Sequence, residues 1–462
     1  MGRRPLAYLL CCFALLLAAR GFAQEDSGGG ADATQAQILQ RLQALESQLA
    51  ELRGVSPGTP AGPAAAKGTD AAAVLARLAA LEKSVAGLKA ARAAPKPQPP
   101  KLEAAVDPPG LEPRIESLEK KAQDLGIQLS GSLAVSYNYN FNDPDSRINR
   151  TRVFDTEHNE FSINLLDVII QRPTDGPGTW GFRADLDVGE DPAVFQAAGF
   201  ADGDNFELEQ AYVDWIAPVG DGLTLRLGKF VTNHGAEVIE SADNWNTSRS
   251  YLFGFAIPFT HTGFLASYSF FEEFALSAGV VNGWDNVDDN NDAKSFHGML
   301  RWAPSDAFSV MVSGTYGAEQ AGNDHDHRGL VTALITVSPW EDWTFMLDLD
   351  YGSEENAGVG TRVGEDAEWL GAALYAKYAI AEEWYAATRL EIFDDDDGAR
   401  LGIVDQTFEE ATLTLGWKPI AHAEVRLEYR HDWSDEDVFD EGDDLGTEDA
   451  QDTLSFEVIY RF

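Results

Sequence analysis

The sequence has few cysteines, few basic residues and no long apolar stretch. Its two cysteines, Cys11 and Cys12, both lie in the first 23 residues, so no disulfide framework holds the rest of the chain. No later segment has the run of about 20 apolar residues that a membrane-spanning helix needs, which excludes a helical membrane protein. Lysine and arginine number 34 against 76 aspartates and glutamates, a net charge of −42 over 462 residues. Such an acidic chain is not expected to bind nucleic acid.

The first residues have the features of a secretory signal peptide. Basic residues precede an apolar run at 6–19, and the letters GFA at 21–23 supply a small residue for cleavage. The run is too short to cross a bilayer as a helix. We therefore expect residues 1–23 to be removed and the mature chain to begin near Gln24.

Residues 24–126 differ from the rest in charge and in period. They hold 12 basic and 13 acidic side chains, whereas residues 127–462 hold 19 and 63, a net charge of −44. Three short stripes have the 4, 3, 4, 3 spacing of a heptad seam, and proline-rich spacers separate them. The stripes begin at Ile38, Val74 and Leu111. They predict short α-helical coiled-coil segments that oligomerise; the alternative is an amphipathic helix that folds back on its own domain.

From Ile127 the period of the apolar residues changes to two. In residues 127–141 the odd positions are mostly apolar and the even positions mostly polar, which predicts a β-strand with one face of each kind. Similar segments recur to the end of the chain. We place sixteen strands at 127–141, 158–171, 179–189, 206–217, 222–230, 260–270, 273–282, 294–303, 306–316, 328–338, 342–352, 367–379, 382–393, 406–418, 421–432 and 451–462.

The connections indicate how these strands are arranged. Short links such as FEE, APSD and KPIA alternate with long acidic ones. An even number of strands joined alternately by tight turns and long loops is typical of a transmembrane antiparallel β-barrel in a bacterial outer membrane. Several strands carry repeated charges on one face, which would be costly in a sandwich core but can line water. A soluble β-sandwich or solenoid is the alternative, and it leaves those charged faces unexplained.

The last residues, LSFEVIYRF, alternate up to an aromatic terminus. An apolar edge strand of this kind is an aggregation hazard unless it is paired. We therefore expect the last strand to pair with the first and to close the barrel, with lipid on its apolar face. Tyr460 and Phe462 resemble the assembly signal of bacterial outer-membrane barrels, and the even strand number places both ends of the barrel, and residues 24–126, in the periplasm.

Sixteen strands leave a channel, and its narrowest part is expected at the third long connection, residues 231–260, which we call loop three. By analogy with general porins, loop three would fold inward; the alternative is that it packs outside or against a neighbouring subunit. Its candidate constriction residues are Glu237, Glu240, Asp243 and Arg249. The candidate pore-wall residues are Arg183, Asp185, Asp187, Arg226, Arg301 and Arg389. Opposed charges there would orient solutes and set ion selectivity.

The long connections hold much of the acidic charge. The densest stretches are Asp394–Asp397 and Asp435–Asp449. An acidic mouth concentrates cations and repels anions, so we expect a cation-preferring channel for small hydrophilic solutes. A simpler interpretation is that the acids only solvate the surface or bridge lipid headgroups through divalent ions.

Two stretches are more distinctive than ordinary strand alternation. They are GKFVTNHGAEVIESADNWNTSRSYLFGFAIPFTHTGFLASY at 228–268 and VNGWDNVDDNNDAKSFHG at 281–298. They resemble the OmpL-like β-barrel porin family, and the similarity extends over residues 127–462. The resemblance implies an outer-membrane porin with no settled substrate, and it does not include the heptad segments.

Metal sites and enzyme activity find weaker support. Asp288, Asn290 and Asp292 have the spacing of an EF-hand loop, but the glycine and the bidentate glutamate of that loop are missing, so a loop-bound Ca²⁺ competes with a plain acidic loop. The HDH triplet at 325–327 is a weak metal motif. His234, His261 and Ser248 lack any spacing typical of a catalytic site, and we expect no cofactor and no enzyme activity.

The oligomeric state and a second role follow from the heptad segments. If the protein is a homo-trimer, its coiled coil would be a parallel three-stranded one. The barrel could alternatively serve as a structural anchor that links the outer membrane to the cell wall through residues 24–126.

Overall fold

The computed structural model describes residues 120–199 and 205–462. The predicted signal peptide and the heptad stripes up to residue 119 lie outside the described residues. Residues 120–125 are helical and lead directly into the first strand. Within the described ranges, no helix is both long enough and apolar enough to cross a membrane.

Sixteen antiparallel strands form a closed barrel, and a separate two-stranded sheet lies in the last long connection. The barrel strands are β1 (Gln128–Asn140), β2 (Glu160–Arg172), β3 (Trp180–Gly189), β4 (Phe206–Ala217), β5 (Leu223–Val231), β6 (Thr260–Phe271), β7 (Phe274–Val281), β8 (Ser295–Ser305), β9 (Phe308–Ala318), β10 (His327–Trp340), β11 (Trp343–Glu354), β12 (Ala367–Ala381), β13 (Trp384–Asp394), β14 (Thr407–Ile420), β15 (Ala423–Ser434) and β18 (Ala450–Arg461). The other elements are α5 (Pro192–Phe195), β16 (Phe439–Glu441), β17 (Asp444–Glu448), the 3₁₀ turns η1 (Ser241–Asp243) and η3 (Gly360–Arg362), and the π-helical turn η2 (Leu252–Ala256). All sixteen predicted barrel strands are confirmed, with bounds that move by a few residues.

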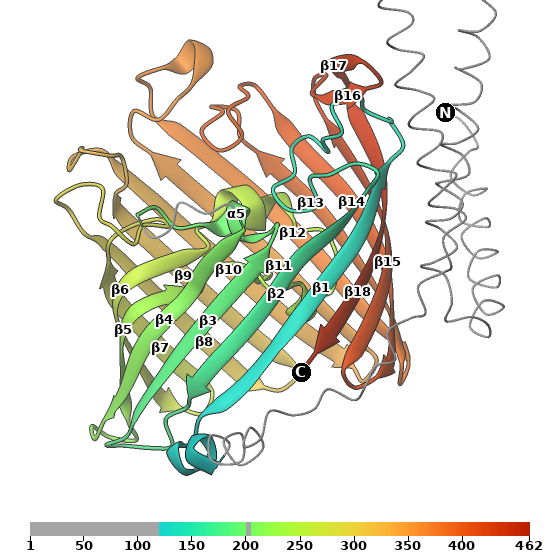
Figure 1. Cartoon of the computed structure of the whole chain (residues 1–462). Coiled ribbons are helices and arrows are strands. Elements are labelled where there is room, and N and C mark those ends of the chain that lie inside the picture. Colours follow the sequence, from blue (N-terminus) through green and yellow to red (C-terminus); the bar gives the residue numbers. More distant parts are fainter. Residues whose placement is uncertain (1–119, 200–204) are drawn as a thin grey trace, which may run out of the picture. The chain divides into compact units, whose positions relative to one another are not determined.

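The last strand pairs with the first and leaves no open edge. β1 and β18 lie side by side in Figure 1, in register from Ser132 opposite Arg461 to Asn140 opposite Thr453. The backbone of Phe462 exchanges two hydrogen bonds of 3.0 Å with Gly131, so the ladder continues to the last residue. Because the barrel is closed, each strand has a neighbour on both sides for its backbone hydrogen bonds. A membrane requires this, since lipid offers no hydrogen-bond partners.

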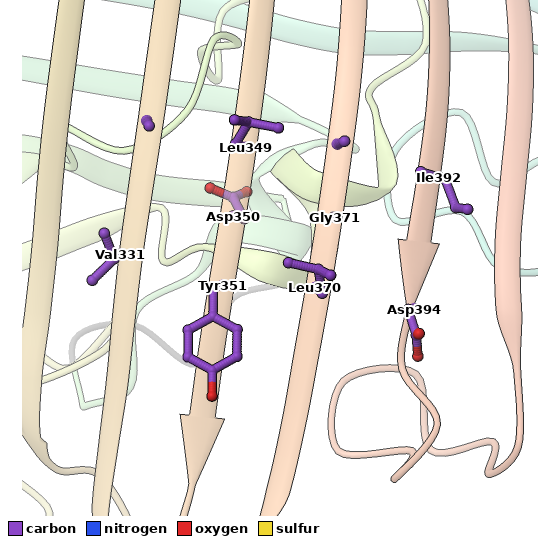
Figure 2. Close-up of a pocket in the computed structure, with 10 residues that line it drawn as sticks. Val331, Leu349, Asp350, Tyr351, Leu370, Gly371, Ile392 and Asp394 are labelled. Atoms are coloured by element: carbon purple, nitrogen blue, oxygen red, sulfur yellow. The ribbon is translucent and has the colours of Figure 1, made fainter.

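Residues alternate between the outer and the inner face of the wall. On the outer face of β10–β13, Val331, Leu370 and Ile392 are 53%, 56% and 46% exposed, whereas Asp350 on the inner face is 1% exposed. Figure 2 shows these side chains around a shallow, mainly apolar groove between the strands. The outer face therefore suits lipid, and the charged residues of the strands point into the barrel.

Aromatic residues gather where the strands meet the short turns. Trp384 and Trp417 stack with their ring centroids 5.7 Å apart, and Trp180 and Trp215 do so at 5.6 Å. Trp340, the last residue of β10, is 65% exposed. Rings in this position match the aromatic belt that barrels place at a membrane–water interface.

The long connections contain structure that the alternation did not predict. β16 and β17 form a hairpin within residues 435–449, and α5 lies between β3 and β4. Both contribute to the interior: Phe439 and Phe195 belong to one buried apolar cluster with residues of loop three. The barrel is thus filled partly from its long-loop end.

Candidate functional site: loop three and the acidic cluster

Loop three, which the structure bounds at residues 232–259, lies inside the barrel and crosses it. Near its start, the Ala236 amide donates to Asp348 of β11 at 2.8 Å. Near its middle, the Ser241 hydroxyl donates to Glu457 of β18 at 2.5 Å. Further on, the Tyr251 amide donates to Glu391 of β13 at 2.8 Å. The segment therefore contacts the wall from β11 round to β18.

Three inward arginines of β13 and β15 bind the carbonyl groups of loop three. Arg426 donates to the Asn244 carbonyl at 2.7 Å, and Arg389 donates to the Ser248 carbonyl at 2.8 Å. Arg430 donates to the Arg249 carbonyl at 2.5 Å. An irregular segment at membrane depth has no regular partners for its carbonyls, and these arginines supply them.

Inward acids of the same wall bind the amides of loop three. Glu428 accepts from the amides of Thr247 and Ser248 at 2.6 and 2.8 Å, and Glu391 also accepts from Leu252 at 2.6 Å. The sequence predicts that repeated charges on one face of a strand line water, and the charges of 424–430 are one such set. That expectation is wrong for Arg426, Glu428 and Arg430, which are 1% exposed because loop three covers them.

An apolar cluster seals the contact near the long-loop ends of the strands. It joins residues of loop three to the inner wall and to other connections. Its members include Phe154, Phe195, Tyr251, Phe253, Phe259, Trp369, Phe393, Phe408 and Phe439. Burying side chains of this size contributes about 2 kcal/mol each before entropy is counted, so the cluster holds loop three firmly inside the barrel.

The four candidate constriction residues separate into two pairs. Glu237 and Arg249 are 6% and 4% exposed and hold the loop together: Glu237 accepts from Ser250 and pairs with Arg389 at 2.6 Å, while Arg249 binds the carbonyls of Val238, Thr247 and Ile239. Neither faces an open passage. The Asp243 side chain is 69% exposed and lies 3.3 Å from Arg461, and the Glu240 side chain faces β3.

Opposite loop three, β2, β3 and β4 present a group of carboxylates, which we call the acidic cluster. It consists of Asp167, Asp185, Asp187, Glu209 and, from loop three, Glu240. Carboxylate oxygens of Asp185, Glu209 and Glu240 lie within 4.8 Å of one another. Asp167 and Asp187 are direct neighbours across β2 and β3. Like charges placed this closely repel each other unless cations or protons are shared among them.

A β-bulge gives the acidic cluster its shape. Asp185 pairs with Gln210 and Leu186 with Leu208, so Glu209 is the extra residue of β4 and escapes the regular alternation. A bulge re-aims a side chain, and here Glu207, Glu209 and Gln210 are all buried. Lys229 forms an ion pair with Glu207. Its charge is therefore balanced by Glu207 and not by Glu209.

Few basic side chains pair with the carboxylates of the acidic cluster. Arg183 donates to both oxygens of Asp185 at 2.8 and 2.9 Å and lies 3.9 Å from Glu240. Asp187 and Glu209 are fully buried and contact each other through their carboxyl groups, and among the described residues no basic side chain pairs with either. Burial raises the pKa of the Glu240 carboxyl, and the charges of Asp243 and Asp185 raise it further. The cluster is thus a group of buried carboxyl groups with Arg183 as the base that contacts it.

The remaining wall bases lie nearer the short-turn end. Arg226 pairs with Asp214 at 2.9 Å, and its guanidinium lies 3.7 Å from the Tyr212 ring centroid. Arg301 is exposed near the end of β8, in register with Ala275. Arg389 contacts loop three as expected of a wall base, whereas Arg226 and Arg301 contact the wall or solvent.

The predicted calcium ligands do not converge. Asp288 packs against Gly199, and Asn290 donates to the Glu319 carbonyl at 3.2 Å. Asn290 and Asp292 line a polar hollow with Asp324, to which Asp288 does not contribute. The three side chains thus have different neighbours, and a loop-bound Ca²⁺ on Asp288, Asn290 and Asp292 stays a prediction.

Comparison with known proteins places this arrangement in a family. A family model described as "Putative beta-barrel porin-2, OmpL-like" matches residues 126–462. The chain belongs to this family. This porin is therefore an outer-membrane β-barrel protein, and the family and fold point to a channel rather than to an enzyme.

Solved porins share the fold of this porin at low sequence identity. An anion-selective porin from Comamonas acidovorans has 11% identity and a TM-score of 0.52, with 73% of this chain and 99% of that chain covered. The outer membrane channel DcaP of Acinetobacter baumannii has 12% identity and a TM-score of 0.50, with 73% and 97% covered. Pseudomonas putida OprB has 12% identity and a TM-score of 0.50, with 75% and 97% covered. The comparison with curated proteins gave no match.

Proposed function

We propose that this porin passes small hydrophilic solutes by diffusion and prefers cations. The acidic cluster supports this proposal most directly, because five carboxylates meet inside the barrel with Arg183 as their bound base. A unit charge about 4 Å from another contributes about 1 kcal/mol even in water, and more where the dielectric is lower. Cations entering the lumen are therefore stabilised at the cluster, and anions are repelled.

The acidic long connections act in the same direction. Asp435 and Glu436 are exposed in the last of them, and Asp394–Asp397 lie at the end of β13. Their charge raises the concentration of cations at the mouth but is screened within about 8 Å at physiological ionic strength. We assign them a role in attraction and the acidic cluster the role in selection.

Single-channel recording in a planar bilayer under a salt gradient tests this function. We expect discrete current steps whose reversal potential has the sign of cation selectivity, because the lumen is acidic. Well-folded protein that produces no steps, or steps with anion selectivity, would contradict the proposal. Folding is checked beforehand by the mobility shift on heating that intact barrels show in detergent gels.

A closed barrel that serves as an anchor is the second candidate function. The many hydrogen bonds between loop three and the wall favour this role, because they hold loop three inside the barrel, where it narrows the lumen. In this role residues 24–126, placed in the periplasm, would tether the outer membrane to the cell wall. Deleting 24–126 should then loosen the membrane from the wall while leaving permeability unchanged; a porin role predicts no loosening.

The same topology suggests how the barrel is oriented in the membrane. We place the short-turn end, with the first residues of β1 and the last of β18, in the periplasm, where the processed chain would begin near Gln24. We further propose a homo-trimer joined by the heptad segments. Cross-linking of the full chain and of a chain without 24–126 distinguishes assembly through those segments from assembly through the barrel wall.

Phe462 allows a test of the assembly signal. Its two hydrogen bonds with Gly131 are made by backbone atoms, so Phe462→Ala preserves them and removes only the contact of the ring with Gly131. We expect this variant to refold in detergent as well as the wild type but to reach the outer membrane in several-fold lower amount, because the aromatic side chain serves recognition rather than closure. Equal amounts in the membrane would argue against a signal at Phe462, and Phe456→Ala, also outward on β18, is the matched control.

A further inference from the structure

Three buried histidines from separate elements meet at the start of loop three. His234 belongs to loop three, His261 to β6 and His297 to β8, and they are 3%, 0% and 2% exposed. The ring centroids of His261 and His297 are 4.4 Å apart, and those of His234 and His297 are 5.2 Å apart. One nitrogen from each ring lies within 4.8 Å of the other two. The spacing of these three histidines along the sequence does not indicate that they meet.

The hydrogen bonds around the rings define which nitrogens carry lone pairs. The Gly283 carbonyl lies 3.2 Å from His261 Nδ1 and can only accept, so Nδ1 carries the proton and Nε2 has the lone pair. The Asn233 side-chain nitrogen lies 3.4 Å from His297 Nε2 and can only donate, so Nε2 has the lone pair and a metal there would replace this hydrogen bond. The Thr315 hydroxyl lies 3.0 Å from His297 Nδ1 and accepts its proton. Such outer partners fix the orientation of metal-binding histidines in proteins.

Hydroxyl groups hold the third ring in the same manner. His234 Nδ1 lies 3.0 Å from the Thr332 hydroxyl and 2.9 Å from that of Ser313, and Nε2 lies 2.8 Å from the Thr315 hydroxyl. A hydroxyl can either donate or accept, so its proton can turn away when a ring nitrogen binds something else. The rings are expected to be neutral, because three buried positive charges in contact would be very unfavourable.

Negative charge without a partner lies on the neighbouring wall. Asp350 of β11 is the cross-strand neighbour of Thr332, and it is 1% exposed. Among the described residues, neither of its carboxylate oxygens has a hydrogen-bond partner, and neither does Asp348 Oδ1. Asp350 is thus linked to the His234 ring through Thr332, whose hydroxyl lies 3.0 Å from His234 Nδ1.

We propose that His234, His261 and His297 bind a divalent transition-metal ion and thereby fasten the start of loop three to β6 and β8. Imidazole ligands suit Zn²⁺, Cu²⁺ and Ni²⁺ and do not suit Ca²⁺ or Mg²⁺, which prefer oxygen. Nitrogen ligands lie about 2.0–2.1 Å from tetrahedral Zn²⁺ and so about 3.4 Å from one another. Small movements of the three rings reach that geometry.

The metal links loop three to a part of the wall that the arginines do not reach. The bonds from Arg389, Arg426 and Arg430 all come from β13 and β15. His261 and His297 lie on β6 and β8, across the barrel order from those strands. This fastening is independent of cation selection by the acidic cluster, so either can fail without the other.

Titration of the full, metal-stripped protein with Co²⁺ tests the site. Tetrahedral Co²⁺ bound to nitrogen absorbs visible light, and added Zn²⁺ should displace it with the loss of that absorption. We expect one Co²⁺ for each chain in the wild type. His261→Gln and His297→Gln should each weaken Co²⁺ binding by at least about a hundredfold. Loss of a residue that only hydrogen-bonds to a ligand weakens metal binding by about a hundredfold at most, and loss of a ligand should cost more.

Two further variants complete the design. Thr332→Val keeps all three rings but removes a partner of His234, and it should weaken Co²⁺ about tenfold to a hundredfold. The double change His325→Gln and His327→Gln removes the histidines of the HDH triplet and should leave binding unchanged. The proposal is overturned if His297→Gln and Thr332→Val bind Co²⁺ as the wild type does, or if only the double change abolishes binding. Heat-dependent gel mobility confirms the barrel in each variant.

Discussion

Replacing Asp187 and Glu209 together by Asn and Gln should remove most of the cation preference of the channel. Both carboxyl groups belong to the acidic cluster and are fully buried, and no basic side chain among the described residues pairs with either, so the negative charge that they share acts mainly on ions in the lumen. Each charge contributes about 1 kcal/mol or more to a cation about 4 Å away, roughly a fivefold effect on occupancy. The reversal potential under a salt gradient should therefore move strongly towards zero, with the current steps retained.

A matched change in the last long connection separates the two sources of negative charge. Asp435→Asn with Glu436→Gln removes the same charge from exposed positions. Its effect should be small at physiological salt and should appear chiefly at low salt, because exposed charges are screened. If both double variants shift the reversal potential equally, the mouth selects the ions and the acidic cluster does not.

The barrel could be predicted from the sequence because its two surroundings impose a period of two on every strand. Because lipid lies outside and polar groups lie inside, an apolar residue such as Val331 must face outward and a charged residue such as Asp350 must face inward. The closing strand was equally clear from the alternation before Phe462. The hairpin of β16 and β17 was not predicted, because its short strands have no apolar face against lipid.

The interior was less predictable because its partners are far apart in the sequence. Arg389 and Glu237 are 152 positions apart, and no local pattern indicates that they meet. Glu209 would be assigned to the inner face by alternation with Glu207, but its closeness to Asp185 and Glu240 depends on the bulge in β4. Arg249 appeared to be the base of a constriction, yet an irregular segment inside a barrel needs donors for its own carbonyls, and Arg249 supplies them.

Arg389→Met should release loop three from the wall while leaving the barrel intact. The arginine is fully buried and donates to Glu237, to Glu410 and to the Ser248 carbonyl. Its removal leaves the buried Glu237 without its cation and Glu410 with Arg430 alone, at 3.6 Å, and breaking a buried pair in this way typically costs about 3–5 kcal/mol. The strand ladder does not depend on this side chain, so the cost falls on the contact of loop three with β13 and β14. We expect protease cleavage within loop three and larger current steps.

Arg226→Met provides the comparison that makes this result specific. Arg226 also faces the lumen, but its side chain is 27% exposed and pairs with Asp214 on the wall rather than with loop three. A partly exposed pair contributes about 1 kcal/mol or less, so this variant should keep loop three protected. Adding Glu237→Gln to Arg389→Met should restore part of the protection, because it removes one of the stranded charges. If protease cleaves the Arg226 and Arg389 variants alike, or neither, the ion pairs of Arg389 do not hold loop three, and the apolar cluster around Phe253 and Trp369 must do so instead.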